Sequence, residues 1–205
     1  MITVIENAEN PGSIRRAGEI LKRGGLVAFP TETVYGLGAN ALDAEAAARI
    51  YAAKGRPSDN PLIVHIARME DLSAVARNIS HKAVLLAERF WPGPLTMIFE
   101  KTARVPYGTT GGLDTVAVRM PKDKVALAVI EAGGGFIAAP SANTSGRPSP
   151  TTAEHVAQDM NGRIDMILDG GPAGIGLEST IVDMSGEIPT ILRPGYISRE
   201  MLRET

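Results

Sequence analysis

The sequence predicts an α/β fold in a single domain that spans residues 1–205. Short apolar segments typical of strands alternate with helix-like segments along most of the chain. Apolar residues make up 44% of the sequence and charged residues 21%, which is the balance of an ordinary globular protein. The 22 glycines and 14 prolines indicate many shaped loops, and such loops often carry functional sites.

The predicted strands are short apolar runs bounded by glycine, proline or polar turn residues. They occupy residues 1–5, 26–29, 62–66, 95–99, 115–120, 136–139, 166–168, 179–184 and 190–192. The predicted helices occupy residues 13–23, 44–53, 80–90, 122–132 and 151–160, with a short one from residue 198. Gly24 and Gly25 end the first helix, while Asp43 caps the second helix and Gly55 ends it.

Composition excludes several classes of protein. The net charge is −2, whereas a protein built mainly to hold nucleic acid is usually basic. The absence of cysteine excludes disulfides, thiolate nucleophiles and cysteine-ligated zinc. The first ten residues lack the regions of a signal peptide, and no apolar run approaches the roughly 20 residues that cross a bilayer. We therefore expect a cytoplasmic protein with no membrane partner.

The common nucleotide and hydrolase signatures are missing. There is no GxxxxGK[ST] loop, and no GxGxxG follows a predicted strand. HExxH is absent, and the three histidines are too scattered to indicate a zinc site. Ser141 lies in a PSAN segment rather than in a GxSxG nucleophile elbow. The remaining candidates are polar and basic residues in loops or inside apolar strands.

Two polar clusters lie in the first third of the chain. PTETVYGLG at 30–38 places hydroxyls, a carboxylate and a phenol at the end of an apolar strand, where open α/β sheets bind ligands; a turn with a helix N-cap is the alternative. KGRPSDNP at 54–61 places two cations around a glycine, a pattern that suits a polyphosphate or a carboxylate. Cations that only complement a helix dipole are the alternative, which is stronger for Lys54 than for Arg56.

Strand alternation places Thr115 and Arg119 on one face of the segment 115–120, with valines on the core face. Arg119 there needs an anionic partner or water. The alternative is a half-exposed strand with a snorkelling arginine. The same alternation places His65 opposite the apolar residues of 62–66, either as a ligand contact or as a satisfied, partly buried histidine.

Later segments add hydroxyls and one more cation. Loop 138–149 combines small residues, which let a backbone approach a ligand closely, with short polar donors, although ordinary polar loops share this composition. These donors are Ser141, Asn143 and Ser149. The glycine-rich turn 174–180 brings Ser179 to the start of a strand. Arg193 ends the last strand, where it either reaches a phosphate or caps the sheet.

Taken in order, these clusters resemble the YrdC/Sua5 family. The matching stretches span nearly the whole chain with family-like spacing, and seven of them in the right order are very specific. They are PTETVYGLG (30–38), KGRPSDNPLIVHI (54–66), WPGPLT (91–96), VAVRMP (116–121), APSANTSG (139–146), LESTIVD (177–183) and LRPG (192–195).

The resemblance implies a YrdC-like twisted mixed sheet flanked by helices around a large, positively charged cavity. It also implies an L-threonylcarbamoyladenylate synthase, a nucleotidyltransferase that makes threonylcarbamoyl-AMP and pyrophosphate from L-threonine, bicarbonate or CO2, and ATP. The product serves the threonylcarbamoyladenosine modification of tRNA through a separate threonylcarbamoyl transferase complex, so any tRNA contact here is weak or transient. Mg²⁺ is expected to enter with ATP and bridge its phosphates.

The resemblance also assigns roles to the matching residues. Its Lys-x-Arg and Ser-x-Asn pairs make the catalytic set Lys54, Arg56, Ser141 and Asn143. The implied ATP contacts are Arg56, Asn60, Thr115, Ser141, Ser149 and Arg193. The implied L-threonine contacts are Thr33, His65, Arg119, Ser179 and the backbone near Ala139. No general base stands out, since Glu32 and Glu178 are only the nearest acidic candidates, and no residue is assigned to a metal.

Two alternatives stay open on the sequence. A YrdC-like module that binds double-stranded RNA or tRNA without synthase activity predicts salt-dependent RNA affinity and no threonine-dependent pyrophosphate release. A carbamoyl-handling domain of the hydrogenase-maturation type comes with cysteine-rich zinc modules, for which this cysteine-free chain has no room. The chain stops about ten residues after LRPG, so it resembles either the short, single-domain members or a truncated two-domain one.

Overall fold

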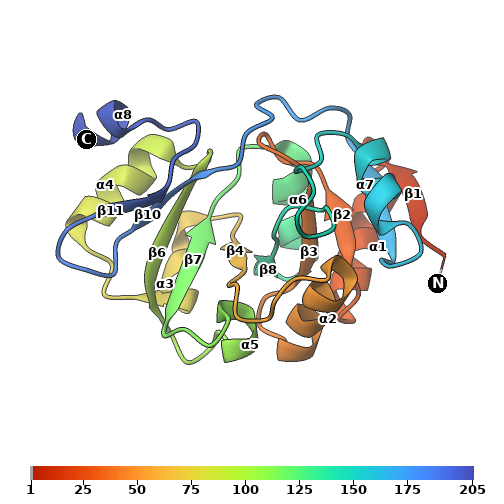
Figure 1. Ribbon diagram of the computed structural model, residues 1–205, viewed down its shortest axis with the longest axis horizontal. Coiled ribbons are helices and arrows are strands. Elements are labelled where there is room, and N and C mark those ends of the chain that lie inside the picture. Colours follow the sequence, from red (N-terminus) through yellow and green to blue (C-terminus); the bar gives the residue numbers. More distant parts are fainter. Residues whose placement is uncertain (1) are drawn as a thin grey trace.

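A computed structural model describes residues 2–205 and has a twisted mixed β-sheet flanked by helices (Figure 1). The structure confirms the predicted α/β fold, while the single domain over residues 1–205 stays a prediction. Within residues 2–205, no helix combines the length and the apolar character that a membrane crossing requires.

The sheet joins strands from the whole length of the described chain. Its strands are β1 (Val4–Asn7), β2 (Val27–Phe29), β3 (Gly36–Asn40), β4 (Ile63–His65), β5 (Ala76–Arg77), β6 (Leu95–Lys101), β7 (Thr115–Arg119), β8 (Ile137–Ala138), β9 (Met166–Asp169), β10 (Thr180–Asp183) and β11 (Thr190–Arg193). Their order is β1-β9-β2-β3-β8-β4-β7-β6-β10-β11, with β5 beside β6. The first predicted strand, 1–5, begins later than expected, as β1; Met1 lies outside the described residues.

All six predicted helices are present, with small shifts at their ends. The helices are α1 (Pro11–Lys22), α2 (Ala44–Lys54), α3 (Leu72–Val75), α4 (His81–Phe90), α5 (Tyr107–Thr110), α6 (Lys124–Ala132), α7 (Ala153–Met160) and α8 (Arg199–Arg203), with a 3-10 turn η1 at Met69–Asp71. The short elements α3, α5, η1 and β5 are not predicted from the sequence. The first strand β1 and the last helix α8 lie at opposite ends of the molecule (Figure 1).

Side-chain caps fix the ends of the helices that the sequence predicts. Asp43 accepts a hydrogen bond from the backbone N–H of Glu45 at 2.9 Å, which starts α2. Gly55 ends that helix in the left-handed region with φ of 61°, a conformation that favours glycine. Ser80 caps α4 in the same way as Asp43 caps α2. The end of α2 thereby positions the segment 54–61 beside the central strands.

The glycine-rich segment 30–38 is not the turn with a helix N-cap that the sequence left open as an alternative, because its last residues begin β3. This strand pairs antiparallel with β2, so the two form a hairpin, and β3 also pairs with β8. A Cβ atom on Gly38 would lie 2.7 Å from Cε1 of Phe29, closer than real contacts allow. The glycine that suggests a turn therefore makes room for an aromatic ring in a strand.

The core lies on both sides of this sheet. Helices α1 and α6 contact each other and cover strands β2 and β9 with side chains that are fully buried. Among them are Leu21, Phe29, Val129, Ile130 and Met166. Val64 of β4 and Val118 of β7 are fully buried in a second cluster, as strand alternation predicted. The opposite face of β4 and β7 is thereby left for His65 and Arg119.

Candidate active site

One cavity of about 200 Å³ gathers most of the predicted site residues. Those that line it are Thr33, Arg56, Asn60, His65, Arg119, Ala139, Ser141, Ser179 and Arg193. Among the described residues of the lining, Glu178 is the one acidic side chain beside three arginines, so the wall is positively charged. Its volume is below the roughly 300–1,000 Å³ of typical small-molecule pockets, while the large cavity that the resemblance implies stays a prediction.

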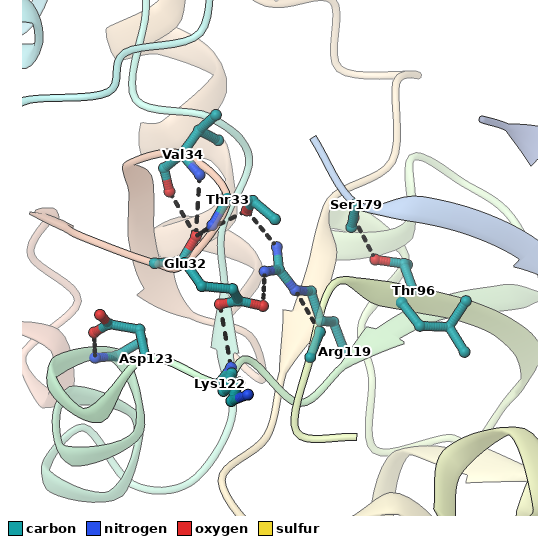
Figure 2. Close-up of polar contacts among 12 residues, drawn as sticks. Glu32, Thr33, Val34, Thr96, Arg119, Lys122, Asp123 and Ser179 are labelled. Atoms are coloured by element: carbon teal, nitrogen blue, oxygen red, sulfur yellow. Dashed lines mark hydrogen bonds and ion pairs between the residues drawn. The ribbon is translucent and has the colours of Figure 1, made fainter. Parts of the chain in front are cut away.

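Arg119 is held in the wall of this cavity by three acceptors. It ends β7 beside His65 of β4 in parallel register. Its Nε donates to the carbonyl of Gly93 at 3.3 Å, its Nη1 to Oγ1 of Thr33 at 3.0 Å and its Nη2 to Oε1 of Glu32 at 2.6 Å (Figure 2). A guanidinium has five N–H groups, so one N–H on each terminal nitrogen remains for a ligand. Both remaining N–H groups can donate to the oxygens of a carboxylate.

Glu32 supplies the counter-ion that a buried arginine needs. Its Oε2 accepts a hydrogen bond from the backbone N–H of Lys122 at 3.1 Å, so both carboxylate oxygens are engaged (Figure 2). Burial lowers the pKa of Arg119, and the charge of Glu32 opposes that shift. Glu32 therefore positions Arg119, and its engaged oxygens do not favour the general-base role considered from the sequence.

His65 faces the cavity but is buried beneath its surface. Burial, followed by the nearby charge of Arg119, lowers the pKa of the His65 imidazole to about 3, although two backbone carbonyls oppose the shift. The ring is therefore neutral near pH 7, with Nδ1 at 3.1 Å from the carbonyl oxygen of Ile63. A neutral imidazole can shape the pocket and hydrogen-bond a ligand, but it adds no positive charge.

Ser179 lies where β6 and β10 run in parallel. Its hydroxyl is 2.8 Å from Oγ1 of Thr96, which is fully buried in β6 (Figure 2). Arg193 donates from Nη2 to the same hydroxyl at 3.2 Å and from Nε to the Ser179 carbonyl at 3.1 Å. Ser179 thus connects the buried Thr96 to an arginine in the cavity wall.

Glu178 pairs with two residues for which the resemblance implies ATP contacts. Its Oε2 lies 2.5 Å from Nη1 of Arg193, and its Oε1 accepts a hydrogen bond from Oγ of Ser149 at 2.8 Å. Ser149 reaches the cavity only through this contact and is not part of the lining itself. The phosphate-binding donors predicted here therefore already have an anionic partner from the chain.

Lys54 and Asn143, predicted as catalytic residues, lie behind the cavity wall rather than in it. Lys54 is buried, and its Nζ donates to the backbone carbonyls of Ser141 and Asn143. Burial, and then the charge of Arg56, lowers the pKa of Lys54 to about 8. Asn143 donates from Nδ2 to the carbonyls of Thr144 and Arg147 at 2.9 and 2.8 Å. Both side chains therefore hold the shape of the loop that presents Ser141.

Arg56 lies in the cavity wall and folds back on its own segment. Its Nη2 donates to Oδ1 of Asn60 at 2.6 Å and to the carbonyl of Pro61 at 3.2 Å. Thr115, the remaining predicted ATP contact, does not line the cavity and lies beside Glu100 in the sheet. It precedes Arg119 by four residues, about 13 Å along a strand, which explains why it lies beyond the lining.

A larger hollow of about 780 Å³ lies elsewhere and contains none of the predicted site residues. It lies between the ends of α1 and α2 and the start of β9, and its lining includes Arg23, Arg49 and Arg163. Arg49 donates to the carbonyl of Gly24 at 2.9 Å and Arg163 to that of Ala53 at 3.5 Å. These arginines satisfy carbonyls near helix ends, which is a structural role.

Residue patterns did not identify the hydrogen-bond partners of Arg119, Arg193 and Ser179. Gly93 and Thr96 lie in the WPGPLT stretch. The only sequence signal for Thr96 is that it places a hydroxyl within an apolar strand. Glu32 and Glu178 were visible as acidic residues inside motifs, but the pattern does not show that each neutralises an arginine. These pairings depend on the fold, because the partners are distant in the sequence or lie on different elements.

Comparison with known proteins agrees with the resemblance. The Sua5/YciO/YrdC family model, described as "Telomere recombination", matches residues 19–195. The threonylcarbamoyl-AMP synthases of Pyrococcus abyssi and Bacillus subtilis are 55% and 54% identical over 204 and 198 residues, covering 100% and 96% of this chain and 60% and 57% of those proteins. The crystal structure of P. abyssi Sua5 complexed with L-threonine has a TM-score of 0.94 and 55% identity, covering 99% of this chain and 59% of that one.

The chain thus spans 60% or less of the length of these curated relatives. The family match includes every segment that builds the cavity, from the β2–β3 turn to Arg193. The chain belongs to the Sua5/YciO/YrdC family.

Proposed function

We propose that the chain is an L-threonylcarbamoyladenylate synthase, an enzyme that forms threonylcarbamoyl-AMP and pyrophosphate from L-threonine, bicarbonate or CO2, and ATP. The observation that carries the proposal is the Arg119 fork, which keeps two N–H groups for a carboxylate in a cavity that also presents Arg56, Ser141 and Arg193. The relatives named threonylcarbamoyl-AMP synthase support the same assignment.

The threonine end of the cavity is the region around Arg119. Its two unused N–H groups donate to the threonine carboxylate, and the neutral ring of His65 lies beside that position in the sheet. Ser179 and Thr33 contribute hydroxyls to the same space, and the backbone at Ala139 closes it. A small zwitterion with a hydroxyl of its own matches this mixture of a cation, hydroxyls and backbone.

The nucleotide end is the region around Arg56, Ser141 and Arg193. Two guanidiniums there suit the oxygens of a polyphosphate, and Ser141 lies on the loop that Lys54 holds. Asn60 extends this end through its contact with Arg56. The two ends share one cavity, so the threonine and the phosphates lie close together.

In the proposed reaction, the threonine amine attacks CO2 and loses a proton to water, which gives a carbamate. A carbamate oxygen then attacks the α-phosphorus of ATP in line, forming a new O–P bond while the bond to pyrophosphate breaks. The residues of the chain contribute position and charge neutralisation rather than a covalent intermediate. This role fits a wall of arginines and hydroxyls, in which Glu178, the lining carboxylate among residues 2–205, is already paired.

Mg²⁺ is proposed to enter with ATP, held chiefly by phosphate oxygens and water. Within residues 2–205, no group of three or more histidine, aspartate or glutamate side chains is placed to hold a metal ion. When bound, the ion would neutralise phosphate charge.

The proposal extends to the partners and location of the protein. A separate threonylcarbamoyl transferase complex would take the product to tRNA in the cytoplasm. The net charge of −2 suits a protein whose own contact with tRNA is weak or transient. These assignments follow from the family and the proposed reaction.

A pyrophosphate-release assay tests the function. Purified protein with ATP, Mg²⁺ and bicarbonate is expected to release pyrophosphate when L-threonine is present and to lose most of that release when threonine is omitted or replaced by L-valine. L-Valine matches threonine in shape but lacks the hydroxyl. Equal release without threonine would contradict the substrate assignment, while salt-dependent RNA binding without any release would favour the RNA-binding module.

A further inference from the structure

The carboxylate of Glu178 occupies the donors that a phosphate group needs. It contacts Nη1 of Arg193 and Oγ of Ser149, a guanidinium and a hydroxyl, which are also common phosphate ligands. Carboxylate and phosphate oxygens therefore compete for the same N–H and O–H groups. Bound ATP can use these donors fully only where Glu178 releases them.

The charges around Glu178 favour an anion at this place, whether it comes from the chain or from a ligand. Burial lowers the pKa of Lys54 and of Arg56, and the negative charge of Glu178 opposes both shifts. Arg193 contacts the Glu178 carboxylate directly, and the charges of Lys54 and Arg56 act on it from nearby. Glu178 thus takes the electrostatic position of a phosphate at the nucleotide end.

The Glu178 carboxylate is held only by side chains. Among the described residues, its hydrogen-bond partners are Arg193 and Ser149, whereas Glu32 is also fixed by the backbone N–H of Lys122. The side chain of Glu178 is 36% exposed and that of Glu32 is 14% exposed. Water can therefore solvate the Glu178 carboxylate once it leaves Arg193, so displacing the carboxylate costs little free energy.

We propose that Glu178 is an internal anion that occupies the phosphate end of the cavity and lowers the affinity for ATP until the nucleotide displaces it. This inference rests on the proposed function, because it takes ATP as the ligand. It makes Glu178 a residue that sets nucleotide affinity, and it explains why the cavity is smaller than a nucleotide pocket. It also predicts that substitution of a residue in the cavity wall improves binding.

Calorimetric titration with ATP in EDTA tests the proposal without any contribution from a metal ion. Glu178→Gln is expected to bind ATP about two- to fivefold more tightly than the wild type, the size expected for removal of a partly exposed ion pair. Adenosine, which has no phosphate, should bind both proteins equally. Glu187→Gln removes the same charge from an exposed residue outside the cavity and should match the wild type.

The outcomes separate this inference from the proposed function. Wild type that binds no ATP would overturn both. Wild type that binds ATP, with Glu178→Gln equal or weaker, would overturn the internal anion alone. A loss of affinity in Glu178→Gln that occurs only when Mg²⁺ is added would instead identify Glu178 as a metal ligand and likewise overturn the proposal.

Glu178→Ala provides a second variant that should shift affinity in the same direction, and thermal unfolding checks that each variant is folded.

Discussion

Two arginines in the wall of the same cavity each pair with a glutamate, yet the two pairs differ in burial and in how they are fixed. The side chains of Arg119 and Glu32 are 5% and 14% exposed, and each makes further hydrogen bonds to the surrounding backbone. The side chains of Arg193 and Glu178 are 34% and 36% exposed, and the Glu178 carboxylate has only side-chain partners. The first pair is part of the folded core, whereas the second lies at an opening.

This difference indicates how one cavity can serve two ligands. A buried ion pair is stable only when both partners are hydrogen-bonded, so Arg119 is pre-positioned before a carboxylate arrives. A half-exposed pair contributes little to stability and can open at small cost. We infer that the threonine end is preformed and that the nucleotide end is occupied by the chain itself.

The largest expected effect comes from a substitution that disrupts the preformed threonine end of the cavity. Arg119→Ala removes the fork for the threonine carboxylate, and we expect kcat/KM for threonine to fall about 100-fold or more, with a much smaller change in ATP affinity. Pyrophosphate release and an ATP titration measure the two effects. Arg119→Lys keeps the charge but loses the fork, and Arg68→Ala, which changes an exposed arginine, is the control. A larger loss of ATP binding than of threonine use would mean that the two ends are swapped.

A stability measurement sharpens the comparison of the two pairs. Glu32→Gln leaves the buried Arg119 without a counter-ion, and we expect the free energy of unfolding to fall by about 2 kcal/mol. Glu178→Gln changes a half-exposed pair and should alter it by less than about 1 kcal/mol. Urea denaturation of both variants gives the two values. Equal losses would show that exposure does not separate the pairs.

A further effect concerns pH and the preformed end. Burial lowers the pKa of His65 to about 3, against about 6.5 in an unfolded chain. Between these pH values the unfolded chain binds one proton more at His65 than the folded protein does. The stability that the folded protein gains from a neutral His65 is therefore lost as the pH falls from 6.5 towards 3. We expect the stability difference between wild type and His65→Asn to change across this window in urea denaturation at pH 7, 6, 5 and 4. A constant difference would contradict a neutral buried ring.

Much of the fold follows from local sequence signals. Asp43, Gly55 and Ser80 mark helix ends, and the structure has those ends where the signals predict. The strand β3 was missed because Gly38 is required by the packing of Phe29, a contact that no local pattern contains. Very short elements such as β5 and α5 also carry too few residues for a pattern to be distinctive.

The site was predictable as a set of residues but not as a set of contacts. Strand alternation placed Arg119 and His65 on the face opposite the core, and the structure has both in the cavity wall. The same alternation could not tell that Thr115 lies too far along β7 to reach it. Nor could it show that Nζ of Lys54 donates hydrogen bonds to two backbone carbonyls, because those acceptors lie almost 90 residues away.

A crystal structure of the wild-type protein with ATP and L-threonine tests the difference between the two ends most directly. We predict that Glu32 keeps its contact with Arg119 while the threonine carboxylate takes the two unused N–H groups, and that Arg193 exchanges Glu178 for a phosphate oxygen. Both ligands bound with the Arg193–Glu178 pair intact, or with the Arg119–Glu32 pair broken, would contradict this account.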